Sequence, residues 1–243
     1  MKALKFLSLI ILICLSIGLK AQIKLGNLVK QAISAGGNPS SAEIGSGLKE
    51  ALQAGVSAGA DKLSVKDGFL ADAAVKLLFP PEAQKVEKTL RGLGMNKLCD
   101  DFVMSLNRAA EDAAKEAKPI FISAIKDMSI SDASAILLSS QKDAATQYFK
   151  DATTSQLRTK FQPVIQNSLD KAGASRYWTD LTTTYNKVPF VGKINTDLTG
   201  YATQKSIDGL FHEVAQQELA IRTSSSARTS PLLQKVFAYA DKK

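Results

Sequence analysis

Glu218 and Arg222 are the residues whose types and spacing are best suited to chemistry. They lie four positions apart, in the order that favours an ion pair along a helix. With Phe211 at the centre of an apolar helix face, both charges fall on that same face. Such a pair either emerges from the core or is buried, and a buried pair persists only with further hydrogen bonds. We favour a structural ion pair that joins this helix to the last one, with Arg228 or Lys235 contributing. The alternative is a ligand carboxylate or phosphate held by Arg222.

A second polar group lies within an alanine-rich segment and comprises Asn107, Arg108, Glu111, Asp112 and Lys115. At helical spacing these residues lie away from the apolar stripe of the same segment. We expect a solvated face with local ion pairs, each worth about 0.3–0.5 kcal/mol, because charged residues are seldom buried. The alternative is a polar site covered by another helix. The candidate binding residues are therefore Asn107, Arg108, Glu111, Glu218 and Arg222.

The sequence contains one histidine, which limits catalytic and metal chemistry. His212 and Glu213 resemble the start of a zinc-protease motif, but Gln216 stands where the second histidine would be. Cys99 lies between apolar residues and is expected to be a buried, inert thiol. No nucleophile elbow or phosphate-binding loop accompanies these residues. We predict no catalytic residue, no metal ligand and no cofactor.

The N-terminus has the pattern of a secretory signal peptide over residues 1–21. Two lysines precede an apolar run over residues 6–19, and Ala21 offers a cleavage site that leaves Gln22 as the new N-terminus. A retained anchor helix is the alternative. Lipid attachment at Cys14 is disfavoured, because the preceding Ile13 is bulky. We expect an exported chain in the periplasm or associated with the outer membrane.

Removal of the signal leaves a mildly basic chain. The signal contains three lysines and no acids, so the net charge of +8 falls to +5. No run of five or more basic residues is present, which argues against a nucleic-acid partner.

Helical periodicity runs through residues 22–243, and no segment alternates long enough for a convincing strand. Ser40 and Glu43 form a capping-box pattern, and Ser230 with Pro231 begins the last helix. We expect Pro119 to kink a helix or begin a new one, and Pro163 to bend or split another. The prediction is one all-α domain, an irregular bundle of eight to ten helices. The main helices expected cover residues 23–34, 41–63, 70–78, 82–91, 96–118, a stretch ending at 138 and capped by Ser129 or Ser131, 142–169, 176–185, 197–222 and 231–239.

Several short motifs together resemble a known family. They are residues 47–52 (GLKEAL), 107–111 (NRAAE), 128–133 (MSISDA), 136–137 (IL), 144–149 (AATQYF), 208–211 (DGLF), 218–222 (ELAIR) and 232–237 (LLQKVF). In combination they resemble a bacterial family of exported helical proteins catalogued as domain of unknown function 4197. The resemblance implies an all-α fold and an envelope location. It implies no activity, cofactor or catalytic residue.

Three functions remain open from the sequence. The leading one is a non-enzymatic binding or scaffolding protein of the envelope, with an unknown partner, no nucleic acid and no transmembrane segment in the mature chain. The second is a carrier of a lipid or other apolar small molecule, since small residues would allow helices to separate around a cavity (Ala51, Gly55, Gly59, Ala109 and Ala113). The third is an enzyme with a carboxylate and arginine site built from Glu111, Glu218 and Arg222.

Overall fold

The structure is a computed structural model that describes residues 37–192, 194 and 196–243. In this part of the chain eight α-helices and two 3₁₀ turns form, and no strand does, which confirms the all-α prediction. The signal peptide predicted at 1–21 and the helix predicted at 23–34 lie outside the described residues. The helices are α2 (Ser41–Leu63), α3 (Gln84–Gly92), α4 (Asn96–Asp127), α5 (Ala133–Leu138), α6 (Ala144–Lys171), α7 (Ala174–Tyr185), α8 (Leu198–Thr223) and α9 (Pro231–Ala240), with 3₁₀ turns η1 (Pro81–Ala83) and η2 (Ser225–Ala227).

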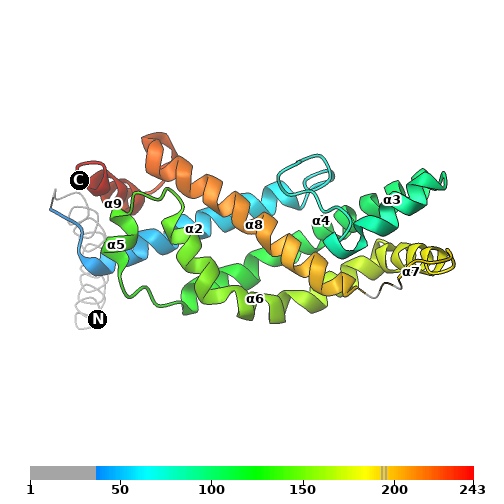
Figure 1. Cartoon of the computed structure of the whole chain (residues 1–243). Helices are drawn as coiled ribbons and strands as arrows, with labels where there is room; N and C mark the ends of the chain where they lie inside the picture. Colours follow the sequence, from blue (N-terminus) through cyan, green and yellow to red (C-terminus); the bar gives the residue numbers. More distant parts are fainter. Residues whose placement is uncertain (1–36, 193, 195) are drawn as a thin grey trace, which may run out of the picture.

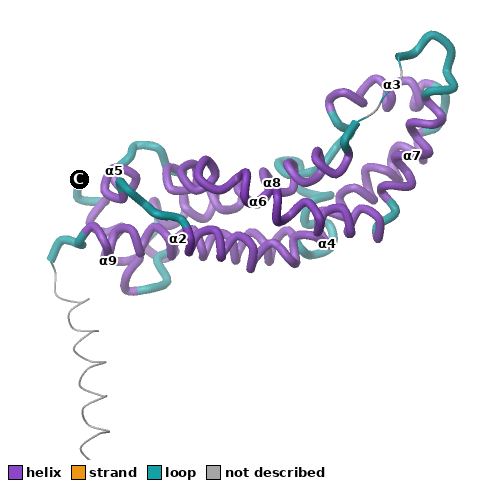
Figure 2. Tube along the Cα trace, turned by 90° about the horizontal axis from the view of Figure 1, so that it is seen from below, coloured by secondary structure: helices purple, strands orange, loops and turns teal. Residues whose placement is uncertain are grey.

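The helices form an elongated bundle. The four long helices, α2, α4, α6 and α8, pack along one another in its middle (Figures 1 and 2). The short helices α5 and α9 gather at one end, and α3 and α7 form the other end (Figure 1). The candidate site residues of α4 and α8 therefore lie on helices that run along the length of the molecule.

Local sequence signals set several helix ends. The capping box at α2 is confirmed: the Glu43 N–H donates to Ser40 Oγ at 3.2 Å, and the Ser40 N–H donates to Glu43 Oε2 at 2.8 Å. Ser230 caps α9, with Pro231 in its first turn, as predicted. The predicted serine cap of α5 is wrong, because Asp132 accepts from the N–H of the third helical residue instead.

Two prolines lie inside long, continuous helices. α4 runs through Pro119 and α6 runs through Pro163, so neither proline begins a new helix. An interior proline removes one helical hydrogen bond and must be offset by packing. Phe121 and Phe161 lie within two residues of these prolines, are fully buried, and bring their ring centroids to 6.4 Å from each other. Both helices thus continue through their prolines beside an aromatic contact between α4 and α6.

The helix predicted at residues 70–78 is wrong. Residues 64–80, here called the α2–α3 segment, form turns and irregular chain instead. The predicted turn at Asp67 and Gly68 is present, and Asp67 has a positive φ of 68°. Backbone groups of this segment that an internal helix would satisfy must find partners elsewhere. Some partners lie within the segment, as where the Lys76 N–H donates to the Asp72 carbonyl at 2.9 Å, and others come from α4 and α8.

The core is built from close helix contacts and a chain of aromatic rings. A Cβ on Gly55 of α2 would lie 3.1 Å from Val214 Cα on α8, so the glycine permits the close approach of these two helices. Phe211 lies 5.6 Å from Phe121 and 5.2 Å from Phe149, between ring centroids. Large side chains from α4, α6 and α8 therefore fill the middle of the bundle.

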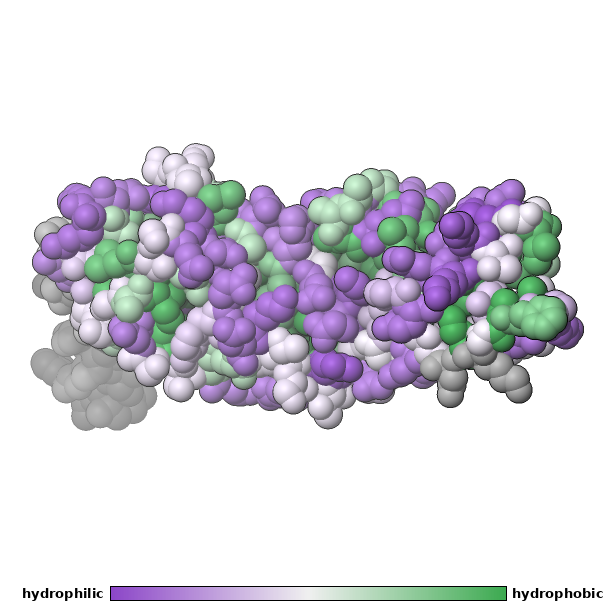
Figure 3. Space-filling view, viewed as in Figure 1, coloured by the Kyte–Doolittle hydropathy of each residue, from purple (hydrophilic) through white to green (hydrophobic). Residues whose placement is uncertain are grey.

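The surface is mixed in polarity. Figure 3 shows mainly hydrophilic side chains over the middle of this face, with hydrophobic ones among them toward both ends. Over residues 37–243, leaving aside 193 and 195, no helix combines the length and the apolar character needed to cross a bilayer.

Candidate functional site

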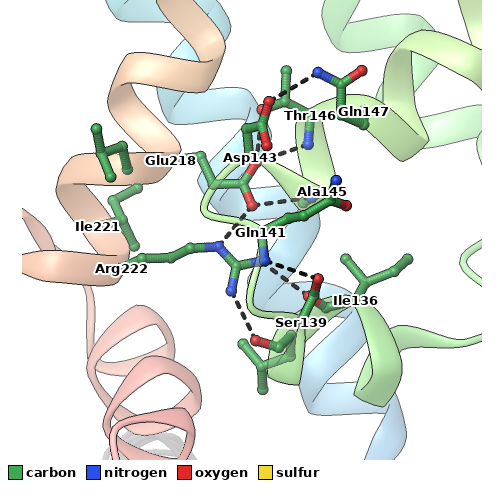
Figure 4. A network of polar contacts seen from close by, with 12 residues as sticks. Ile136, Ser139, Gln141, Asp143, Ala145, Thr146, Gln147, Glu218, Ile221 and Arg222 are labelled. Atoms are coloured by element: carbon green, nitrogen blue, oxygen red, sulfur yellow. Dashed lines mark hydrogen bonds and ion pairs between the residues drawn. The ribbon is translucent and has the colours of Figure 1, made fainter.

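The carboxylate of Glu218 is the centre of a buried polar network (Figure 4). Its Oε1 accepts from the Ala145 N–H at 3.0 Å and from Arg222 Nε at 2.8 Å. Its Oε2 accepts from the N–H and from the hydroxyl of Thr146, each at 2.7 Å. Each oxygen of this side chain thus has two donors.

Arg222 completes the network on the other side. Its Nη1 donates to the Leu137 carbonyl at 2.8 Å, and its Nη2 donates to the Ile136 carbonyl at 3.1 Å. The carboxylate therefore binds N–H groups in the first turn of α6, and the guanidinium binds carbonyls in the last turn of α5. Each charge matches the helix end it contacts, since N-termini favour anions and C-termini favour cations.

The burial of this ion pair agrees with its place on the apolar face, but its attachment differs from the prediction. The Glu218 and Arg222 side chains are 2% and 6% exposed. They join α8 mainly to the connection between α5 and α6, whereas we predicted that they join α8 to the last helix. Lys235 pairs with Glu43 instead, at 2.6 Å. The last helix meets Arg222 through an aromatic ring and not through a charged side chain: the guanidinium carbon lies 5.8 Å from the ring centroid of Phe237.

Arg228 makes the polar contact to the C-terminal end. It donates to the Ile221 carbonyl at 2.9 Å and through two nitrogens to Asp241, at 2.6 and 3.0 Å. The Arg228 guanidinium lowers the pKa of the Asp241 carboxyl. This bidentate pair fixes the residues after α9 to the end of α8.

A second network holds the α2–α3 segment to α4. Asn107 is fully buried: its Oδ1 accepts from the Leu77 N–H at 2.8 Å, and its Nδ2 donates to the carbonyls of Leu77 and Val103 at 2.8 and 2.7 Å. Glu111 is 4% exposed, and its Oε1 accepts from the N–H groups of Phe69 and Leu70, both at 3.2 Å. Two side chains one helical turn apart thus bind three backbone N–H groups of the segment.

Arg108 links the same segment through its charge. It donates to Glu111 Oε2 at 2.6 Å and to Asp67 Oδ1 at 2.7 Å. The carboxylates of Asp67 and, second, Glu111 raise the pKa of the guanidinium above its ordinary value. The ion pair with Glu111 agrees with the prediction, whereas the pairing with Asp67 depends on the fold of the segment.

The predicted solvated face on α4 is wrong for Asn107 and Glu111. The α2–α3 segment covers them, and its unpaired backbone groups require polar partners in the interior. Solvated ion pairs do form nearby, but at Asp112, which is partly exposed and pairs with Lys115 at 3.1 Å and with Lys171, outside the predicted group, at 2.9 Å. Lys171 is the main cause of a lowered pKa at the Asp112 carboxyl. No sequence signal indicates this burial, because the sequence predicts a helix over residues 70–78, where the structure shows turns and irregular chain.

The structure does not bring the five predicted residues into one site. Asn107, Arg108 and Glu111 belong to one network and Glu218 and Arg222 to the other, with no shared hydrogen bond. The described part of the chain holds no group of three potential metal ligands. Cys99 is fully buried, as expected, and burial raises the pKa of its thiol.

A hollow of about 390 Å³ lies between the α2–α3 segment with η1 and α8. Lys76, Lys205 and His212 contribute to its lining, together with Tyr201, whose hydroxyl donates to the Leu78 carbonyl at 3.0 Å. These residues share no motif in the sequence. Only the packing of the irregular segment against α8 brings them together, so sequence reasoning missed them as a group.

Comparison with known proteins leads to a family. The family model described as "Protein of unknown function (DUF4197)" matches residues 38–238, which include both polar networks and the hollow. No curated protein and no solved structure matches the chain. Because the match extends over most of the sequence, the chain belongs to the DUF4197 family.

Proposed function

We propose that this DUF4197 protein is exported and acts in the cell envelope as a non-enzymatic binding or scaffolding protein. One observation carries the proposal: the best candidates for chemistry, Glu218 and Arg222, direct their polar atoms to one another and to α5 and α6. Groups engaged in this way stabilise the bundle and are poorly placed to receive a substrate. We therefore expect residues on the surface of the protein to bind its partner.

The end formed by α3 and α7 is the surface we expect to bind an envelope protein. Phe190 is fully exposed there at 108%, in the chain after α7, and Leu93 is 61% exposed after α3. These are the most exposed of the large apolar side chains in the described part of the molecule. Exposed aromatic and aliphatic side chains are common anchors of protein interfaces.

Export is supported by the sequence of the N-terminal residues. Lysines, an apolar run and Ala21 follow one another in the order of a signal peptide. Cell fractionation with intact-mass measurement tests this step. We expect a chain that begins at or near Gln22 in the envelope fraction, and an uncleaved cytoplasmic chain when Ile10→Arg interrupts the apolar run. Wild-type protein found only in the cytosol with residues 1–21 intact contradicts export.

Photo-crosslinking in intact cells tests the binding surface. A benzophenone amino acid at position 190 should form one discrete adduct with an envelope protein, and Leu93→Ser should weaken that adduct. The same group at Lys160, an exposed position on α6, provides the control. Absence of any adduct from position 190, or an equal adduct from position 160, argues against this surface.

The carrier hypothesis stays a prediction. Gly55 and Gly59, two of the small residues that motivated it, lie in the close contact of α2 with α8: a Cβ on Gly59 would lie 2.8 Å from Glu213 Cβ. Native mass spectrometry of protein purified from its own cells tests it directly, since a carrier retains bound mass. A bare chain contradicts that hypothesis.

A further inference from the structure

The hollow beside α8 has the size and the mixed lining of a ligand site. Its volume of about 390 Å³ falls within the range of roughly 300–1,000 Å³ that is usual for small-molecule sites. Val75 and Phe79 are buried residues in its lining, and the exposed Leu78 extends the apolar surface outward. One part of the hollow therefore offers apolar contact.

The polar part of the lining carries excess positive charge. The side chains of Lys76 and Lys205 form no ion pair or hydrogen bond with any residue that the structure describes. Asp208 is the acidic residue of the lining, and it is already matched by Lys150 at 3.0 Å. Two uncompensated ammonium groups facing one hollow favour an anion.

The wall of the hollow is held in place before any ligand arrives. Asn107 binds both backbone groups of Leu77, and the Tyr201 hydroxyl binds the carbonyl of Leu78. On the α8 side, a Cβ on Gly209 would lie 2.8 Å from a ring carbon of Phe69, so segment and helix are in close contact. Preorganisation of this kind lowers the entropy lost on binding.

From these observations we infer that the hollow between the α2–α3 segment and α8 binds an amphiphilic organic anion, a carboxylate or phosphate head on an alkyl chain. The head lies between Lys76 and Lys205, and the chain lies along Val75, Leu78 and Phe79. Asn107 acts as a positioning residue, because it fixes the wall and does not touch the ligand. This inference goes beyond the proposed function, since it concerns the purified chain wherever the protein is located.

The single histidine provides a local reporter. His212 lines the hollow, and the chain contains no other histidine. Mature protein without a histidine tag, labelled with ¹⁵N-histidine, should therefore give the imidazole signals of one residue. We expect dodecanoate, kept below its micelle concentration, to shift these signals saturably, with calorimetry giving the dissociation constant. Dodecyl maltoside, with a neutral head, and inorganic phosphate, without a chain, should each bind at least tenfold more weakly.

Variants distinguish binding in the hollow from a general attraction of anions to the basic surface of the protein. Lys76→Gln with Lys205→Gln should weaken dodecanoate binding about tenfold or more. Lys160→Gln with Lys187→Gln removes the same charge at exposed positions elsewhere and should leave binding unchanged. Leu78→Ser should weaken dodecanoate and leave the weak response to phosphate as it is. Competition by phosphatidylglycerol vesicles would identify a membrane lipid as the source of the ligand, and its absence would favour a free fatty acid; either result upholds the site.

Three results would overturn the inference: no shift of the His212 signals with millimolar dodecanoate, equal binding of dodecyl maltoside or phosphate, or equal losses in the two lysine pairs. None of them affects export or crosslinking at position 190, so this inference and the proposed function fail separately.

Discussion

Glu218 caps α6 from 72 positions further along the chain, receiving both the N–H and the hydroxyl of Thr146 at 2.7 Å. Asp143, the residue that precedes α6, makes no capping hydrogen bond with its side chain. The start of this long helix is therefore stabilised by a tertiary contact. Arg222 serves the end of α5 in the same way, so the connection between the two helices depends on one buried ion pair on α8.

Removal of one partner of this pair should be strongly destabilising. Arg222→Met leaves the Glu218 carboxylate buried without its countercharge, and we expect a loss of about 3–5 kcal/mol in the free energy of unfolding. Urea denaturation followed by circular dichroism measures it. The control is Arg176→Met, which removes an exposed partner at 3.9 Å from Asp180 and should change stability by less than about 1 kcal/mol. In the double variant Glu218→Gln with Arg222→Met the losses should be less than additive. Equal effects of the two arginine substitutions would show that the pair is not the connecting element.

Asn107→Ala should loosen the α2–α3 segment. The substitution leaves both backbone groups of Leu77 without their partner, at a loss of about 1–3 kcal/mol for each buried group left unsatisfied. Hydrogen exchange measured by mass spectrometry should show faster exchange in peptides that cover residues 69–77. The matched control is Asn96→Ala, at an exposed position in the first turn of α4. Unchanged exchange in that segment would contradict the assigned role of Asn107.

The parts of the fold that the sequence predicts well carry local signals. The capping box at Ser40, the serine and proline at the start of α9, and the long apolar periodicity of α8 involve residues within a few positions of each other. Such signals are visible without knowledge of the partner helices. The place of Glu218 and Arg222 on the apolar face follows the same rule, because the angular position of both residues on α8 is a local property. Their burial, which the sequence left open, depends on the packing of α5 and α6.

The missed parts depend on contacts between distant residues. The α2–α3 segment is irregular because Asn107 and Glu111 satisfy its N–H groups from 30 to 42 positions away. The sequence does not indicate which backbone carbonyls bind Arg222, because every residue has a carbonyl. The solvated-face prediction on α4 failed for this reason: burial of its polar residues depended on a segment whose own course was mispredicted. The hollow was missed because its two walls come from unrelated stretches of chain.

Alanine substitutions at two glycines should have opposite effects on stability. A Cβ at Gly55 would lie 3.1 Å from the backbone of Val214, which cannot move without shifting α8, so Gly55→Ala should lose about 1–3 kcal/mol. A Cβ added at Gly92, at the end of α3, would have no atom of any other described residue within 4 Å, apart from its chain neighbours and the backbone of its own helix. Gly92→Ala should gain about 0.5 kcal/mol, because it restricts the unfolded chain. Thermal unfolding of both variants measures the difference, and a stabilising Gly55→Ala would contradict the close contact of α2 with α8.

The ion pair between Glu43 and Lys235 should contribute to acid unfolding. Lys235 first, then the backbone N–H of Ser40, lower the pKa of the Glu43 carboxyl from 4.5 to about 2. A pKa that is lower in the folded state means that the carboxylate stabilises the fold above about pH 4.5, and that this stabilisation is lost as the pH falls toward 2. Lys235→Gln should bring the folded pKa closer to its ordinary value. The free energy of unfolding should then fall less steeply between pH 5 and pH 2.5.

Two further variants show whether Glu43 is the group that titrates. Glu43→Gln keeps a side chain that can complete the capping box but cannot ionise, so it should flatten the pH dependence at least as much as Lys235→Gln. Once Glu43 is replaced, the additional Lys235→Gln should change the slope no further. Part of the dependence that remains in every variant comes from other carboxyls whose pKa values are lowered in the folded state, namely Asp72, Asp112, Asp170 and Asp241. A slope that Lys235→Gln leaves at its wild-type value would show that this lysine does not set the ionisation of Glu43.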